Sequence, residues 1–298
     1  MQFLNASKEL TMNNSAYKKA VLFYVWEIYK QDLNSGDVTT KYFLPNQSKE
    51  ITAEIVSNEV GILAGIEEAE WFLNKLGIVI VKKLKDGSQL KLGSLILKIK
   101  GPASKILSSE RTLLNLIQRM SGVATATKKM SLKLPKNIKL LATRKTFWGM
   151  LDKKAVVVGG GGTHRLDLSD AVLIKDNHIS LSSDFEKSLE NVFKKVQKIR
   201  FIEIELESLS QVESFLKIYK NLKSKFPINQ NIVVMLDNFT PAILKKIIPQ
   251  FKKLGVSIEL SGGITENNVM RYNIKGISAI SSGSITTKAN SLDISLTI

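Results

Sequence analysis

Residues 141–179 contain an unusual concentration of polar groups that bind anions. Arg144 and Lys145 follow a short apolar run, and His164 and Arg165 follow four consecutive glycines. A Lys-Asp-Asn-His group comes after the next apolar run. Cationic side chains hold carboxylates and phosphates through charge-assisted hydrogen bonds. Because so many polar groups are costly in a core, the stretch predicts a binding site for anionic ligands.

Similar polar clusters follow most apolar runs in the second half of the chain. These runs are β-like and mostly separated by helix-patterned stretches, which indicates parallel strands. They are residues 138–141, 172–174, 201–206, 232–236, 257–260 and 277–280. In (β/α) barrels the carboxyl ends of the strands carry the active site, and the last two loops often hold a phosphate. We therefore expect the active site at this end of the strands.

The residue types at these strand ends fit three tasks. Backbone N–H groups and hydroxyls that suit a terminal phosphate come from Ser261, Gly262, Gly263, Ser282 and Gly283. A positive field for carboxylates or a diphosphate comes from Arg144, Lys145, His164, Arg165 and Lys175. Glu205 and Asp237 suit a hydrated magnesium ion or a developing cation.

Two other kinds of site are disfavoured by the same residues. The glycine run at 159–162 is not followed by the apolar helix start of a dinucleotide-binding fingerprint, because Thr163-His164-Arg165 comes next. A zinc site is disfavoured because the chain has two histidines at the wrong spacing and no cysteine. For His178, a buried, hydrogen-bonded structural role is the alternative to a role in the site.

The remaining elements are expected from periodicity and capping signals. The first half predicts an α+β domain with a helix at 16–29, a polar loop at 32–40, strands at 51–56, 78–81 and 94–99, and a helix at 65–76. Ser108 or Ser109 is expected to cap a long helix. Later helix signals are a capping box at 210–213, Thr240-Pro241 at a helix start, and Gly255 at its end.

Composition limits the classes of protein that remain. A chain of 298 residues with 44% hydrophobic and 23% charged residues is globular, and absence of cysteine excludes disulfides. No apolar run approaches the roughly 20 residues of a membrane helix and no signal segment opens the chain, so we expect a cytoplasmic protein without membrane contact. The formal charge of +16 is spread along the chain, which favours a solvated surface over nucleic-acid binding.

In its polar clusters at the predicted strand ends, the sequence resembles the quinolinate phosphoribosyltransferase family, also called carboxylating nicotinate-nucleotide pyrophosphorylases. The likeness covers almost the whole chain after the first 15 or so residues. The motifs that carry it include ATRKT at 142–146, GGGGTHR at 159–165, LIKDNHI at 173–179, IEIELES at 202–208, VMLDN at 234–238 and SGGIT at 261–265. So many short motifs in one order are highly specific.

The resemblance implies an α/β fold, an incomplete (β/α) barrel with a sandwich-like α+β N-terminal domain. The implied domains are residues 1–110, a barrel at 111–277, and a segment at 278–298 that completes the barrel and packs on the N-terminal domain. It also implies a homodimer, or a homohexamer built as a trimer of dimers. Arg111 would then come from the neighbouring subunit to an active site at the interface.

The implied reaction is that of a pentosyltransferase: ribose 5-phosphate passes from phosphoribosyl diphosphate to quinolinate, releasing diphosphate and carbon dioxide and leaving nicotinate mononucleotide. The resemblance assigns the catalytic roles to Lys145, Lys175, Glu205 and Asp237, the last two also near magnesium through water. It assigns substrate binding to Arg111, Thr143, Arg144, Lys145, His164, Arg165 and Lys175. Ser261, Gly262, Gly263, Ser282 and Gly283 would hold the 5-phosphate.

The chain departs from the family pattern beside the expected substrate loop. Phe147-Trp148-Gly149-Met150 replaces the usual continuation after ATRKT, and Thr163 stands where asparagine usually precedes His-Arg. Four alternatives stay open. They are a nicotinate phosphoribosyltransferase that does not decarboxylate, a relative associated with molybdenum transport, a degenerate, non-catalytic relative that binds a pyridine carboxylate, and, in a different class, a basic nucleic-acid-binding protein.

Overall fold

The computed structural model describes residues 2–298, and these divide into two compact units. The first unit comprises residues 2–6, 130–144 and 162–284, and the second comprises 7–129, 145–161 and 285–298. The units therefore interleave along the chain, whereas the boundaries predicted at 110 and 277 separate consecutive segments. Within residues 2–298, no helix combines the length and the apolar character needed to cross a bilayer.

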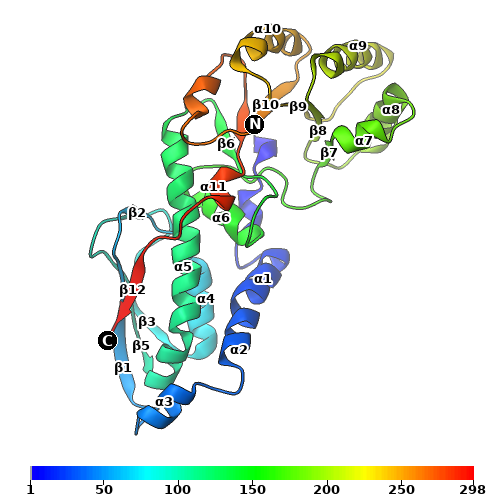
Figure 1. Ribbon diagram of the computed structural model, residues 1–298. Helices are drawn as coiled ribbons and strands as arrows, with labels where there is room; N and C mark the ends of the chain where they lie inside the picture. Colours follow the sequence, from blue (N-terminus) through cyan, green and yellow to red (C-terminus); the bar gives the residue numbers. More distant parts are fainter. Residues whose placement is uncertain (1) are drawn as a thin grey trace. The chain divides into compact units, whose positions relative to one another are not determined.

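The first unit is built on a six-stranded parallel sheet, which confirms the predicted α/β class (Figure 1). The strand order is β6-β11-β10-β9-β8-β7, with β6 and β7 at the two edges. Each expected strand is present within two residues of its predicted bounds. The strands are β6 (Lys139–Leu141), β7 (Val172–Ile174), β8 (Ile202–Leu206), β9 (Ile232–Asp237), β10 (Ser257–Ser261) and β11 (Ala279–Ser281).

Helices follow most of these strands and lie outside the sheet (Figure 1). They are α7 (Asp176–Ser180), α8 (Phe185–Lys195), α9 (Leu209–Lys225), α10 (Pro241–Lys252) and the short 3-10 helix η4 (Val269–Tyr272); α11 (Ser284–Thr287) follows β11. Pro241 is the first residue of α10, as predicted. The capping box of α9 lies two residues earlier than predicted, because Ser208 accepts from the backbone of Gln211 and the Gln211 side chain accepts in return.

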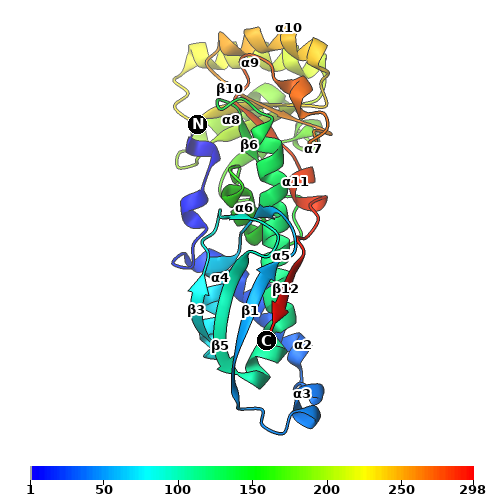
Figure 2. The ribbon, with the colours of Figure 1, turned by 90° about the vertical axis from the view of Figure 1, so that its left-hand side faces the viewer.

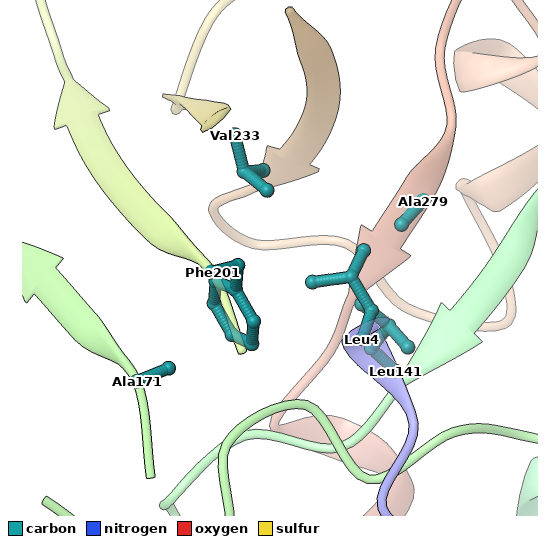
Figure 3. Packing of buried hydrophobic residues seen from close by; sticks show 6 residues of the cluster. All are labelled: Leu4, Leu141, Ala171, Phe201, Val233 and Ala279. Atoms are coloured by element: carbon teal, nitrogen blue, oxygen red, sulfur yellow. The ribbon is translucent and has the colours of Figure 1, made fainter. Parts of the chain in front are cut away.

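The interior of this unit is an apolar cluster drawn from several strands. Its buried members are Leu4, Leu141, Ala171, Phe201, Val233 and Ala279, and Figure 3 shows their side chains facing a common centre. Leu4 belongs to the 3-10 helix η1 (Gln2–Leu4) and is only 1% exposed. The N-terminal segment thus fills the middle of a sheet whose strands begin more than a hundred residues later.

The second unit contains an antiparallel sheet in the order β12-β1-β5-β3, and Figure 2 shows its strands side by side with α4 and α5 on one face. Its strands are β1 (Glu50–Ser57), β3 (Val79–Lys83), β5 (Leu95–Pro102) and β12 (Ile294–Thr297), with a separate pair β2 (Gly61–Ile62) and β4 (Gln89–Leu90). Its helices are η2 (Ser7–Glu9), α1 (Ser15–Val21), η3 (Leu22–Glu27), α2 (Ile28–Leu33), α3 (Val38–Phe43), α4 (Ile66–Leu76), α5 (Ala103–Leu132) and α6 (Met150–Val158).

Two local predictions in this unit are wrong. The predicted loop at 32–40 contains the start of α3, because the Asp37 side chain accepts from the N–H of Thr40 and caps that helix. The long helix α5 begins at Ala103, directly after β5, and not near residue 108. Ser108 and Ser109 lie inside it, and their hydroxyls donate to carbonyls one turn earlier.

We predict that Leu4→Ala lowers the free energy of unfolding by about 2–5 kcal/mol, because it leaves a cavity in the apolar cluster. Chemical denaturation followed by circular dichroism measures this change. Leu181→Ala is the matched control, since Leu181 is 88% exposed and its truncation removes little buried surface. Equal stability of the two variants would show that the N-terminal segment does not contribute to the core.

Candidate active site at the carboxyl ends of the parallel strands

The strand order determines which of the predicted loops are neighbours. The two loops predicted to bind phosphate follow β10 and β11, which pair with each other. The two acidic strand ends belong to β8 and β9, which also pair. Across the sheet from β6 to β7, the strand ends carry Arg144, Ser282 with Gly283, Ser261 with Gly262 and Gly263, Asp237, Glu205, and Lys175. The parallel sheet therefore places the phosphate loops together and the carboxylates together.

The loop after β10 requires glycine at one position. Gly262 has a φ of +94°, and a Cβ added there would lie 2.3 Å from Oδ1 and 2.4 Å from the backbone nitrogen of Asn238. The Asn238 N–H donates to the carbonyl of Ser261 at 3.1 Å, which ties this loop to the end of β9. The Ser282 hydroxyl donates to the carbonyl of Ile264 at 2.6 Å and ties it to β11. The three loops form one connected set.

Carboxylates gather beside this loop set. Lys175 Nζ lies 2.5 Å from Glu205 Oε2, and the Glu205 side chain is 7% exposed. Carboxylate oxygens of Asp176, Glu205 and Glu207 lie within 4.8 Å of one another. Partial desolvation, with Asp176, Asp237 and Glu205 nearby, raises the pKa of Glu207. Oxygen donors of this kind suit a hard divalent cation such as magnesium, which keeps part of its water shell.

The charges of Arg144 and Arg165, both in the first unit, repel each other. Arg165 is 7% exposed, and burial followed by the charge of Arg144 lowers its pKa. Arg144 itself is exposed at the end of β6. Two guanidinium groups held in proximity bind a carboxylate or phosphate more strongly than either alone, because the anion relieves their repulsion. Thr143, half-buried, immediately precedes Arg144.

His164 is buried beside these cations, with both ring nitrogens engaged by the protein. Its Nδ1 accepts from the backbone N–H of Arg165 at 2.8 Å, and its Nε2 lies 2.8 Å from Glu203 Oε2. Glu259 Oε2 is 3.5 Å from the same Nε2. Burial, together with Glu205, raises the pKa of Glu203 to about 8. Burial, together with Glu203, raises that of Glu259 to about 8.

The sequence reasoning did not single out Glu203 and Glu259. Both side chains are fully buried, on β8 and β10. The available signal was a carboxylate inside an otherwise apolar strand, in the patterns IEIEL and SIEL. Such a residue needs a partner when buried, so each pattern indicates a polar group inside the sheet.

Lys145 and Arg111 belong to the second unit. The carbonyl of Lys145 accepts from the Thr286 hydroxyl at 2.7 Å. Arg111 is exposed on α5 and helps to line a cavity of about 440 Å³. The other lining residues are Ile28, Gln31, Asp32, Thr112 and Asn115.

The segment after Lys145, where the chain departs from the family pattern, is anchored within its own unit. Asp152 accepts from the backbone N–H groups of Phe147 and Trp148 at 2.9 and 3.2 Å. The same carboxylate forms a bidentate pair with Arg119, at 3.0 and 2.9 Å. The ring of Trp148 stacks on Tyr24 with centroids 6.3 Å apart. Neither Arg119 nor Asp152 was singled out from the sequence, because nothing local indicates that they pair.

The glycine run at 159–162 and His178 both make contacts with the protein backbone. Gly162 forms a parallel bridge with Leu141 at the end of β6, and an added Cβ would lie 2.7 Å from a Leu141 methyl group. The glycine run therefore extends the sheet edge and leads directly into Thr163 and His164. The buried alternative for His178 is wrong, since this residue is exposed, although its Nδ1 accepts from the Lys175 N–H at 3.0 Å.

The buried carboxyl groups predict a pH dependence of stability. Glu259 has a pKa of about 8 in the folded chain and an ordinary value of 4.5, so the folded state binds more protons between these values. The free energy of unfolding must then fall as pH rises through this window, by at most about 1.4 kcal/mol per pH unit for one group. We predict that Glu259→Gln flattens this fall in denaturation curves measured from pH 5 to pH 8. Exposed Glu213→Gln is the control, and an equal slope in both variants would contradict the prediction.

Comparison with known proteins relates this site to one family. The model described as quinolinate phosphoribosyl transferase, C-terminal domain, matches residues 123–297, and the corresponding N-terminal domain matches residues 37–121. The chain is 34% identical over 281 residues to a probable carboxylating nicotinate-nucleotide pyrophosphorylase of Methanothermobacter thermautotrophicus, covering 91% of this chain and 96% of the relative. It is 35% identical over 296 residues to the protein of the same description in Bacillus subtilis, covering 96% and 95%.

A solved structure agrees with these relatives in fold. The nicotinate-nucleotide pyrophosphorylase of Francisella tularensis superposes with a TM-score of 0.82 at 31% identity, covering 93% of this chain and 95% of that one. Sequence and fold thus agree over nearly the full length. The chain belongs to the quinolinate phosphoribosyltransferase family.

Proposed function

We propose that the protein transfers the phosphoribosyl group of phosphoribosyl diphosphate to quinolinate, releasing diphosphate and carbon dioxide and forming nicotinate mononucleotide. Membership of the family, with curated relatives of this activity at about 35% identity, supports the reaction. The observation that carries the proposal is that one parallel sheet brings Arg144 and the glycine loops to the carboxyl ends of its strands, with the charge of buried Arg165 interacting with that of Arg144. A dicarboxylate needs cations such as these arginines, and a sugar phosphate needs the backbone N–H groups of such glycine loops.

In this proposal, Arg144 and Arg165 bind the pyridine carboxylates, with Lys145 and Lys175 adding positive charge. The loops that contain Gly262 and Gly283 hold the 5-phosphate with backbone N–H groups. Glu205 and Asp237, two of the carboxylates at the strand ends, would hold magnesium through water with their hard oxygen donors. Magnesium, when bound, supplies positive charge that neutralises the diphosphate.

The chemistry then proceeds in two steps. The pyridine nitrogen forms a bond to ribose C1 while the C1–oxygen bond to diphosphate breaks and takes its electron pair with it. Glu205 and Asp237 stabilise the positive charge that develops on the ribose. As carbon dioxide then leaves, the electron pair of the C2–carboxylate bond stays on C2, where the adjacent quaternary nitrogen stabilises it, and C2 takes up a proton. Lys175 lies at the strand end where it can stabilise that carbanion or supply the proton.

An assay of purified protein with phosphoribosyl diphosphate and magnesium tests the reaction directly. We predict that quinolinate releases carbon dioxide and yields nicotinate mononucleotide. Nicotinate should be a poor acceptor, because it has one carboxylate fewer and leaves part of the arginine set without a carboxylate to bind. Lys145→Ala and Arg165→Ala should each lower kcat/KM by about a hundredfold or more, since each removes a charge-assisted contact. Lys217→Ala and Arg271→Ala, which remove exposed cations, are the matched controls. Near-normal turnover in both site variants would refute the assignment.

We further propose that the chain assembles as a homodimer, or as a hexamer of three dimers, in which Arg111 of one copy completes the active site of another. The exposure of Arg111 on α5 and its distance along the chain from the strand-end residues support this arrangement.

Mixing two inactive variants tests the shared site. Arg111→Ala and Lys145→Ala should each be inactive alone, but a heterodimer of the two contains one site with both residues intact. Random reassociation should therefore recover about a quarter of the wild-type activity. No recovery, with heterodimers shown to form by mass spectrometry, would place Arg111 in the site of its own subunit or outside any site.

A further inference from the structure

The interior of the parallel sheet contains a three-residue polar network beneath the strand ends. It consists of Glu203 on β8, Glu259 on β10 and His164 from the loop after the glycine run. None of the three is more than 5% exposed. Oε1 of Glu203 and both carboxylate oxygens of Glu259 have no hydrogen-bond partner among the described residues. Buried polar groups with so few partners are costly, so this network requires an explanation.

The contacts of His164 determine which of its ring nitrogens carries the proton. The backbone N–H of Arg165 points at Nδ1 at 2.8 Å, so Nδ1 must present a lone pair. The proton therefore resides on Nε2, which donates to Glu203 Oε2 at 2.8 Å. The imidazole therefore links Glu203, inside the sheet, to the backbone of Arg165 through two hydrogen bonds.

The same contacts argue against a metal ion in this network, although its ligand atoms lie close together. A metal at Nε2 would need a lone pair there, while Nδ1 already uses its lone pair to accept from Arg165. A ring with a lone pair on both Nδ1 and Nε2 carries no N–H proton and is therefore an imidazolate anion. A neutral imidazole that donates to Glu203 satisfies the geometry without this cost.

The backbone of His164 is held as firmly as its ring. Its φ of 53° lies in the left-handed region, which is strained for a residue with a side chain. Its N–H donates to the carbonyl of Leu4 at 3.0 Å, and its carbonyl accepts from Thr163 Oγ1 at 2.8 Å and from Arg200 Nη2 at 2.9 Å. Such strain persists only where the surrounding contacts fix the conformation. The strained residue, His164, lies immediately before Arg165.

We propose that Glu203 is a positioning residue for substrate binding: through the Nε2–H of His164 it fixes the backbone at Arg165, and thereby holds the Arg144–Arg165 cation pair where it meets the substrate carboxylates. His164 then acts inside the protein and contributes no ring N–H to the substrate. The inference rests on the proposed function for the identity of the substrate. It assigns to His164 a role different from the direct binding expected from the family resemblance.

The tautomer can be observed without any enzymatic assay. In protein labelled with ¹⁵N in the histidine rings, we expect His164 at neutral pH to show a protonated Nε2 and an unprotonated Nδ1. The chain has only two histidines, so the His178→Gln variant assigns the remaining signals to His164. A proton on Nδ1 of His164 would overturn the proposal, whether or not quinolinate is the substrate.

Variants of Glu203 test the link to substrate binding. Glu203→Gln keeps a carbonyl oxygen that accepts from Nε2–H, so its KM for quinolinate should stay within about twofold of the wild-type value. Glu203→Leu removes the acceptor and should raise that KM about tenfold or more, with the KM for phosphoribosyl diphosphate little changed. Equal KM values for quinolinate in the Gln and Leu variants would overturn the proposal.

Two controls separate positioning from general destabilisation. Glu259→Gln alters the neighbouring carboxylate, which lies 3.5 Å from Nε2, and should change the KM for quinolinate less than Glu203→Leu does. If Glu203→Leu does not fold, the ring signals of His164 in the wild-type and Glu203→Gln proteins decide the question, because both must keep the Nε2–H form. Absence of turnover by the wild-type protein would refute the proposed function and leave the ring measurement valid.

Discussion

Every second side chain along a β-strand points to the same face of its sheet. In the parallel sheet of the first unit, this alternation sends Phe201, Glu203 and Glu205 toward one interior. Phe201 lies in the apolar cluster, Glu203 contacts His164, and Glu205 pairs with Lys175 at the carboxyl end of β8. One short segment therefore contributes to the core, to the polar network above it and to the candidate active site. A shift of one residue in register would remove all three from the interior.

The N-terminal segment connects the apolar interior with the loop that carries Arg165. The Leu4 side chain lies in the apolar cluster, and its carbonyl accepts from the N–H of His164. The charges of Arg165 and Lys175 partly offset the burial of Glu203, since both act to lower its pKa. Packing, hydrogen bonding and charge therefore converge at His164. This convergence explains how a strained backbone conformation is maintained directly before Arg165.

Local sequence signals located the strands well and the helix starts less well. The six apolar runs of the second half correspond to β6–β11 because parallel strands covered on both faces are nearly continuous in apolar residues. Capping was harder to predict, because several hydroxyls near a helix start compete for the same N–H groups. Ser208 rather than Ser210 caps α9, and α5 needs no cap at Ser108 since β5 leads directly into it.

The sequence by itself determined the residue types of the site, their order along the chain and, through ATRKT, THR and LIKDNH, the family to which they belong. Only the tertiary structure decided which of them are neighbours, because strand order differs from chain order: β11 pairs between β6 and β10, although it is the last strand of the sheet to be made. Tertiary structure likewise placed Glu203 and Glu259 around His164, and paired Arg119 with Asp152. Such pairs lie dozens of residues apart, so no local pattern of hydrophobicity or charge specifies them.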